Sequence, residues 1–146
     1  MNASPLSSIT TLLRRYPLTL CCIVLIWVLC FCTPPSTGLN NVIGIDKVAH
    51  VLMYFGSCGI FWMELLRHRS AKGKAEVSPS KSGYWSVALG SFAAFTAMSG
   101  LVELLQEFAT PHRSGEWFDL LANASGAALA SCFGALFAMK KCSRQE

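Results

Sequence analysis

Four apolar stretches, separated by short polar segments, dominate the chain at residues 16–33, 48–66, 84–108 and 117–139. Each has close to the ~20 residues that a helix needs to cross ~30 Å of hydrocarbon. Because lipid offers the backbone no hydrogen-bonding partner, a segment that crosses it must be helical. The pattern therefore predicts an all-α, polytopic membrane protein, a single domain over residues 1–146 with four transmembrane helices in an up-and-down bundle.

Composition points the same way. Hydrophobic residues make up 53% of the chain and charged residues only 14%, and the mean hydropathy is +0.45, unlike the balance of a soluble domain. Arg14 and Arg15 before the first stretch resemble the start of a secretory signal, but no small-x-small cleavage site precedes Pro34. We therefore interpret the first stretch as a membrane span.

The distribution of Lys and Arg predicts the orientation. These residues gather in the segments 14–15, 67–81 and 140–144, whereas the other side of the predicted bundle holds only Lys47 and Arg113. The positive-inside bias then places both termini in the cytoplasm, with residues 67–83 as a flexible cytoplasmic linker. The net charge of +4 reflects this topology and the anionic lipid headgroups, so nucleic acid is not an expected partner.

The seven cysteines form no CxxC pair and have no spacing typical of a metal site. Within predicted spans they should behave as small apolar residues. A bridge involving Cys30 or Cys32 at the outer membrane face is left open. No metal or cofactor is predicted from the sequence.

Strong polar groups lie at one end of three stretches, and the predicted topology puts all three ends on the outer side. An ionisable residue at the centre of a membrane helix costs roughly 2.5–3.5 kcal/mol, so such clustering usually marks a site that faces the bundle interior. Spacings of three and four residues place the groups of each helix on one face. The predicted binding residues are Asp46, Lys47, His50, Tyr54, Glu103, Gln106, Arg113, Asp119 and Asn123.

Other positions predict packing. Gly126, Ala130 and Gly134 form a small-xxx-small stripe that lets a neighbouring helix approach closely. Glu64, near the predicted inner end, is expected to extend towards Arg67 or His68 at the cytoplasmic interface.

The order and spacing of these polar residues resemble the VanZ-like membrane family, which is named after an accessory protein of low-level teicoplanin resistance and has no established biochemical activity. The resemblance covers about Asp46 to Met139, with Ala130 where family members often have a further Gly. It is carried by Asp46-Lys47-x-x-His50-x-x-x-Tyr54, Glu103-Leu-Leu-Gln106, Arg113, and Asp119-x-x-x-Asn123-x-x-Gly126-Ala127. It implies an outward-facing envelope protein of the bacterial cytoplasmic membrane that binds or helps to process a lipid or cell-wall precursor and affects glycopeptide susceptibility.

Four interpretations of the polar cluster stay open. The first is recognition of a membrane lipid or lipid-linked envelope precursor, with Arg113 and Lys47 contacting phosphate or carboxylate. The second is catalysis on such a lipid, with His50 as a general base oriented by Glu103 or Asp119. The third adds a metal held by the same three side chains, and the fourth is a purely structural cluster that ties the bundle together. The sequence gives no oligomeric state.

Overall fold

The computed structural model describes residues 10–11, 13–31, 44–71, 81–109 and 116–143, and these ranges contain helices and no strand. The elements are α2 (Pro17–Phe31), α3 (Ile45–Ala71), α4 (Lys81–Ala109) and α5 (Trp117–Ser143). The prediction of an all-α protein is therefore confirmed for the described residues.

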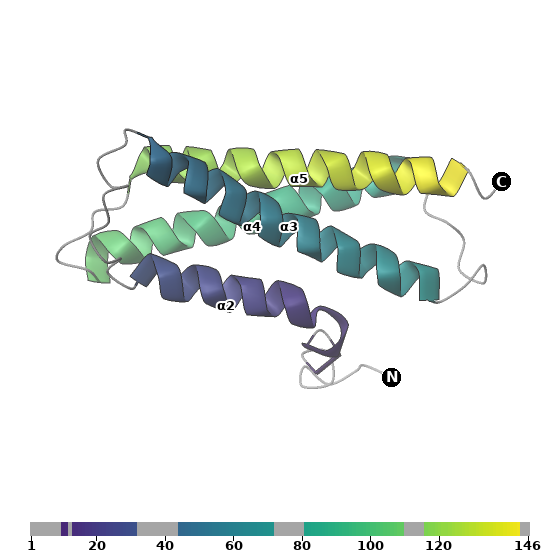
Figure 1. Ribbon diagram of the computed structural model, residues 1–146, viewed down its shortest axis with the longest axis horizontal. Helices are drawn as coiled ribbons and strands as arrows, with labels where there is room; N and C mark the ends of the chain where they lie inside the picture. The colour runs from purple at the N-terminus through teal and green to yellow at the C-terminus, as the bar shows by residue number, and fades with distance from the viewer. Residues whose placement is uncertain (1–9, 12, 32–43, 72–80, 110–115, 144–146) are drawn as a thin grey trace.

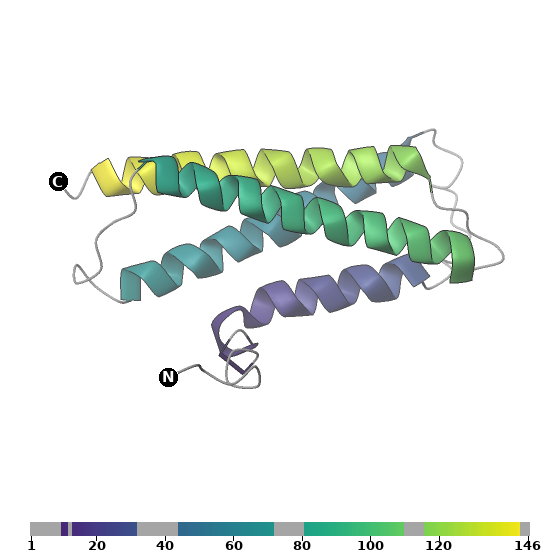
Figure 2. The ribbon, with the colours of Figure 1, turned by 180° about the vertical axis from the view of Figure 1, so that it is seen from behind.

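Consecutive helices run in opposite directions, as Figures 1 and 2 show from two sides. One end of the bundle, which we call the site end, contains the starts of α3 and α5 and the ends of α2 and α4. The other is called the opposite end. Helix α5 packs along both α3 and α4, while α2 lies mainly against α3 and also contacts α4.

Three helices are long and apolar enough to cross a membrane, namely α3, α4 and α5 over Ile45–Ser70, Lys81–Phe108 and Trp117–Ser143. Large apolar side chains such as Leu89 and Phe133 cover their outer surfaces, as expected where a helix faces lipid. Helix α2 has 15 residues, about 22 Å at 1.5 Å per residue, which is short for a span. The end of the first expected stretch, at residues 32–33, lies outside the described residues.

The three long helices extend beyond the apolar runs that predicted them. Residues 67–71 and 81–83 were expected in the linker but are helical, so that expectation was wrong at both of its ends. The hydrophobic run marks the depth of the apolar layer, whereas helical hydrogen bonding continues into the polar interface, where Ser, Lys and Arg are acceptable helix formers.

The close contact between α3 and α5 depends on two glycines. A Cβ atom at Gly126 would lie 2.3 Å from the carbonyl oxygen of Val51, and one at Gly134 would lie 2.3 Å from the Trp62 ring. Both distances are far below van der Waals contact, so only glycine permits this approach. The predicted small-residue stripe therefore faces α3.

A line of buried polar atoms connects α3, α4 and α5 at mid-height. The Trp62 indole donates to Ser91 Oγ at 3.3 Å, Ser91 and Ser131 share a hydrogen bond of 2.9 Å, and the Cys58 thiol lies 3.4 Å from Ser131 Oγ. Trp62 is buried in the core. Its single N–H has a partner there, which makes burial of the large ring favourable.

Side chains from other helices satisfy both ends of α2. Pro17 occupies the first helical position, where its missing N–H costs nothing. Glu64 accepts hydrogen bonds from the backbone N–H groups of Leu18 and Thr19 at 2.9 and 3.0 Å and from the Thr19 hydroxyl at 2.7 Å. At the other end, Gln106 Nε2 donates to the carbonyl oxygen of Cys30 at 2.7 Å.

The role expected for Glu64 was therefore only partly right. His68 is close enough to act on its charge, but the side chain is buried and its hydrogen bonds cap α2. A carboxylate at a helix N-terminus satisfies N–H groups that have no partner within the helix, and it is favoured by the helix dipole.

Candidate functional site

At the site end, the buried imidazole of His50 connects α3 to α5. Its Nδ1 lies 3.0 Å from Asn123 Oδ1, and its Nε2 lies 3.6 Å from Asp119 Oδ2. Asn123 in turn donates to Ser99 Oγ on α4 at 2.8 Å. Because Asp119 and Asn123 are four residues apart, one face of α5 can engage both ring nitrogens.

Lys47 lies between three carboxylates. Its Nζ contacts Asp46 Oδ2 at 3.1 Å, Glu116 Oε2 at 2.6 Å and, more closely, Asp119 Oδ1. The Asp46 side chain is 60% exposed, so Asp46 lies at the rim, outside the buried part of the cluster. These contacts join the first turn of α3 to the start of α5 and neutralise the Lys47 ammonium within the protein.

Glu103 ties α4 to the start of α5. Its Oε2 accepts a hydrogen bond of 3.1 Å from the backbone N–H of Glu116, the residue directly before α5. The carbonyl oxygen of Glu116 accepts the first helical hydrogen bonds of α5, from the N–H groups of Asp119 and Leu120. Glu103 thus fixes where α5 begins, and its carboxylate stays largely buried.

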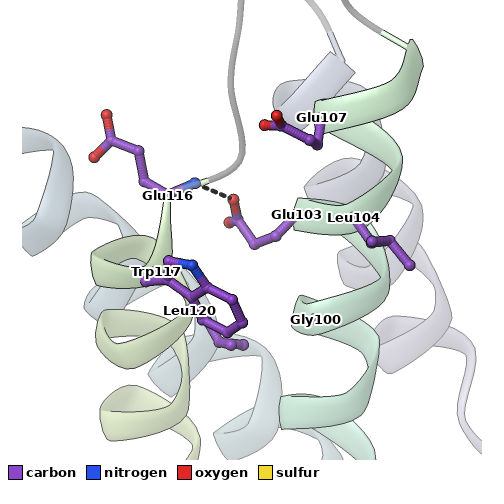
Figure 3. A pocket seen from close by; sticks show the side chains of 7 residues that line it. All are labelled: Gly100, Glu103, Leu104, Glu107, Glu116, Trp117 and Leu120. Atoms are coloured by element: carbon purple, nitrogen blue, oxygen red, sulfur yellow. Dashed lines mark hydrogen bonds between the residues drawn. The ribbon is translucent and has the colours of Figure 1, made fainter.

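Beside this contact lies a groove between α4 and α5 with a volume of about 380 Å³. Figure 3 shows Glu103 and Glu107 pointing from α4 towards the start of α5, with the Trp117 ring beneath Glu116. Trp117 is 84% exposed, so its ring is accessible from the surface. The lining residues are Gly100, Glu103, Leu104, Glu107, Glu116, Trp117 and Leu120.

The groove is acidic at its rim and apolar below. Three carboxylates belong to the lining, and Leu104, Leu120 and the Trp117 ring supply hydrocarbon surface. Gly100 contributes no side chain, and a Cβ atom there would meet only Leu120, at 3.9 Å. Such a surface suits an amphipathic molecule whose polar part donates hydrogen bonds.

Two of the other predicted binding residues, Tyr54 and Gln106, are buried away from the groove. Tyr54 is completely buried in the core, and Gln106 is buried where it satisfies the end of α2. Neither residue lines the groove. Arg113 lies outside the described residues, so its expected contact with a ligand has no structural counterpart here.

Sequence reasoning left several groove residues out of the predicted site. Glu107 lies four residues from Glu103 on α4, so helical spacing alone was a signal that the two share a face. No such signal was present in the sequence for Gly100 and Leu120. Apolar residues and glycines line a groove only where two helices separate, and the sequence does not show that separation. Trp117 was considered as a wall of the polar pocket, because it lies between Glu116 and Asp119, but it was not among the predicted binding residues.

The geometry of the site gives the catalytic and metal-binding hypotheses less support than the structural and ligand-binding ones. His50 is only 7% exposed, and both of its ring nitrogens face protein groups, so the described geometry offers it no path to a substrate. Among the residues with described positions, no three His, Cys, Asp or Glu side chains are grouped to hold a metal ion. The buried half of the cluster stabilises the bundle, and the groove offers binding surface.

No protein-family model, curated protein or solved structure matches this chain in the comparisons that were made.

Proposed function

We propose that this protein is a VanZ-like envelope factor of the bacterial cytoplasmic membrane that binds the polar head of a lipid or lipid-linked wall precursor in the groove between α4 and α5. In this proposal α2 is a fourth, short span, both termini are cytoplasmic and the site end faces outwards. An effect on glycopeptide susceptibility, teicoplanin included, would be the cellular consequence suggested by the family resemblance.

The charge of the described residues supports this orientation. Lys and Arg are concentrated at the opposite end, as Arg14, Arg15, Arg67, Arg69, Lys81, Lys140 and Lys141, where Glu64 is buried under α2. The site end carries mainly carboxylates, with Lys47 among them. Basic residues favour the cytoplasmic side during insertion.

The groove is the observation that carries the binding proposal. It lies beside the end of two apolar helices, so a lipid could place its tail along Leu104 and Leu120 and its head against the carboxylates. Ionised carboxylates only accept hydrogen bonds, which favours heads rich in hydroxyl, amide or ammonium groups. Sugars and peptides of wall precursors carry such donors.

Lys47 takes a different role from the one expected of it. Because three carboxylates surround its ammonium group, we assign Lys47 to joining α3 and α5 and not to phosphate recognition. Arg113 remains the candidate for an anionic group of the ligand.

Catalysis has weaker support than recognition. Asp119 and Asn123 occupy the two ring nitrogens of His50, which is how a structural histidine is satisfied. The described part of the groove presents carboxylates without an adjacent nucleophile. Binding without turnover is therefore the proposed activity.

The test uses Trp117 as a built-in reporter. Purified protein in phosphatidylcholine nanodiscs is titrated with a lipid-linked disaccharide–pentapeptide, with phosphatidylglycerol as the comparison lipid, while tryptophan fluorescence is recorded. The expected result is a saturable change with the precursor that W117F lacks. A signal that persists in W117F would come from Trp27, Trp62 or Trp85 and would contradict binding in the groove.

A matched pair of variants on α4 separates the groove from general effects. G100L fills the groove beside Leu120, whereas G90L adds the same side chain at an exposed position with nothing within 4 Å. G100L should abolish the saturable change and G90L should retain it. An equal response from both variants would overturn the proposal.

A further inference from the structure

At the opposite end, Arg69 has a positive charge with no described counter-ion. Its guanidinium carbon lies 5.4 Å from the centre of the Tyr84 ring, a cation–π contact between the end of α3 and the start of α4. Its Nη1 is enclosed by protein and has no hydrogen-bonding partner. Within the described residues no carboxylate pairs with Arg69, although a guanidinium has five donors to satisfy.

The surroundings of Arg69 add positive potential. Helix α4 begins at Lys81 and has no acidic residue in its first turn, so its partly positive N-terminus adds positive potential near Tyr84. From α5, Lys141 Nζ donates to Ser70 Oγ at 2.9 Å, beside Arg69 in the last turn of α3. Three helix ends therefore bring cationic groups together.

The one described carboxylate at this end is already engaged. Glu64 is buried under α2 and accepts three hydrogen bonds there. A partly buried charge without a counter-ion is unfavourable, so the arrangement favours an anion supplied from outside the described residues. The helix ends lie at the predicted level of the lipid headgroups, where the available anions are phosphates.

We propose that Arg69, together with Lys81 and Lys141, binds the phosphate of one acidic phospholipid at the opposite end of the bundle. The proposal depends on membrane insertion of α3, α4 and α5 but not on the groove or its ligand. The partly exposed guanidinium, held against Tyr84, can donate hydrogen bonds to phosphate from the N–H groups that the protein does not enclose. Lys141, held by Ser70, supplies a second charge from another helix.

The test compares lipid retention in nanodiscs. Protein is reconstituted in phosphatidylcholine with a minor share of phosphatidylglycerol, transferred to mild detergent, and analysed by native mass spectrometry for the lipid that stays bound. The wild type should retain phosphatidylglycerol over phosphatidylcholine, and R69Q should bind it about tenfold more weakly, as expected for loss of a charge-assisted contact. No headgroup preference in the wild type would overturn the proposal.

R67Q is the matched control, because Arg67 is an exposed residue of the same turn region of α3 and its loss changes net charge equally. Retention should be unchanged in R67Q. Equal losses in R67Q and R69Q would indicate diffuse attraction and contradict a defined site. R69K, which keeps the charge but not the planar fork, should lie between the wild type and R69Q.

Two further experiments control for misfolding of R69Q and for binding of free phosphate in place of a lipid. K141Q changes a different helix and should also weaken retention several-fold, so the proposal stays testable if R69Q does not fold by circular dichroism. Sodium phosphate added to phosphatidylcholine discs should leave the thermal unfolding of the wild type unchanged. Stabilisation by the free ion that depends on Arg69 would identify a soluble-phosphate site and refute the lipid assignment.

Discussion

Replacing Gly126 by alanine tests the contact that positions the polar cluster. The new Cβ atom would lie 2.3 Å from Val51 O and 3.0 Å from Phe55 N, whereas an unstrained C···O contact is about 3.3 Å or longer. Both neighbours are backbone atoms and cannot rotate away. Helix α5 would therefore have to move by about 1 Å relative to α3, in a core packed to crystal-like density.

The displacement reaches the site, because Asn123 lies one turn from Gly126. The 3.0 Å contact between His50 and Asn123 would lengthen to about 4 Å, beyond hydrogen-bonding range. Overpacking costs about 1–3 kcal/mol and the lost hydrogen bond about 1 kcal/mol, partly offset by about 1 kcal/mol from the higher helix propensity of alanine. We expect a net loss near 2 kcal/mol.

The assay is thermal unfolding in detergent, followed by intrinsic fluorescence. A loss of this size should lower Tm by about 4–8 °C. G90A is the control, because a Cβ atom there has nothing within 4 Å, and it should keep or slightly raise Tm. The reasoning is refuted if G126A unfolds at or above the temperature of G90A.

Three further changes probe other contacts. E64Q replaces one of the two oxygens that cap Leu18 and Thr19 and removes the charge, so hydrogen exchange of residues 17–31 should become about tenfold faster while exchange in α5 stays unchanged. N123A removes hydrogen bonds to two buried partners and should destabilise the protein by about 2 kcal/mol in thermal unfolding. G134A should displace the Trp62 ring, against which its Cβ would press, and shift tryptophan emission to the red as the ring meets a more polar environment.

Each of these has a neighbouring control. M63L alters an exposed residue next to Glu64, and S125A an exposed residue near Asn123, and both should behave as wild type. For the emission shift, W85F should leave the effect of G134A intact, because Trp85 is on the exposed surface. Exchange in α2 that is equally fast in M63L would contradict the capping role of Glu64.

The sequence predicted what periodicity and hydropathy determine. Long apolar runs identified α3, α4 and α5, and the spacing of His50, Asp119 and Asn123 placed each on the inner face of its helix. The helix ends were less well predicted, since hydropathy reports the apolar layer and not the limit of backbone hydrogen bonding. Asp46 fits the same spacing as His50, but it lies in the first turn of α3, where its side chain reaches solvent.

The sequence did not predict which side chains would pair with one another. Lys47 pairs with Glu116 and Asp119 across 69 and 72 residues, and several other carboxylates were equally suitable by charge alone. Glu64 accepts hydrogen bonds from backbone N–H groups of α2. Every residue type except proline has such a group, so the sequence does not identify which ones Glu64 binds. The groove depends on the missing side chain of Gly100 and on how far α4 and α5 separate, which only packing determines.

Photocrosslinking at the groove tests the central proposal most directly. Leu104, which lines the groove, and Leu89, an exposed residue elsewhere on α4, are each replaced by p-benzoylphenylalanine in cells, and the adducts formed on irradiation are identified by mass spectrometry. We predict that position 104 captures a lipid with a sugar or peptide head, while position 89 captures only bulk phospholipid. The same bulk phospholipids at both positions would contradict the account.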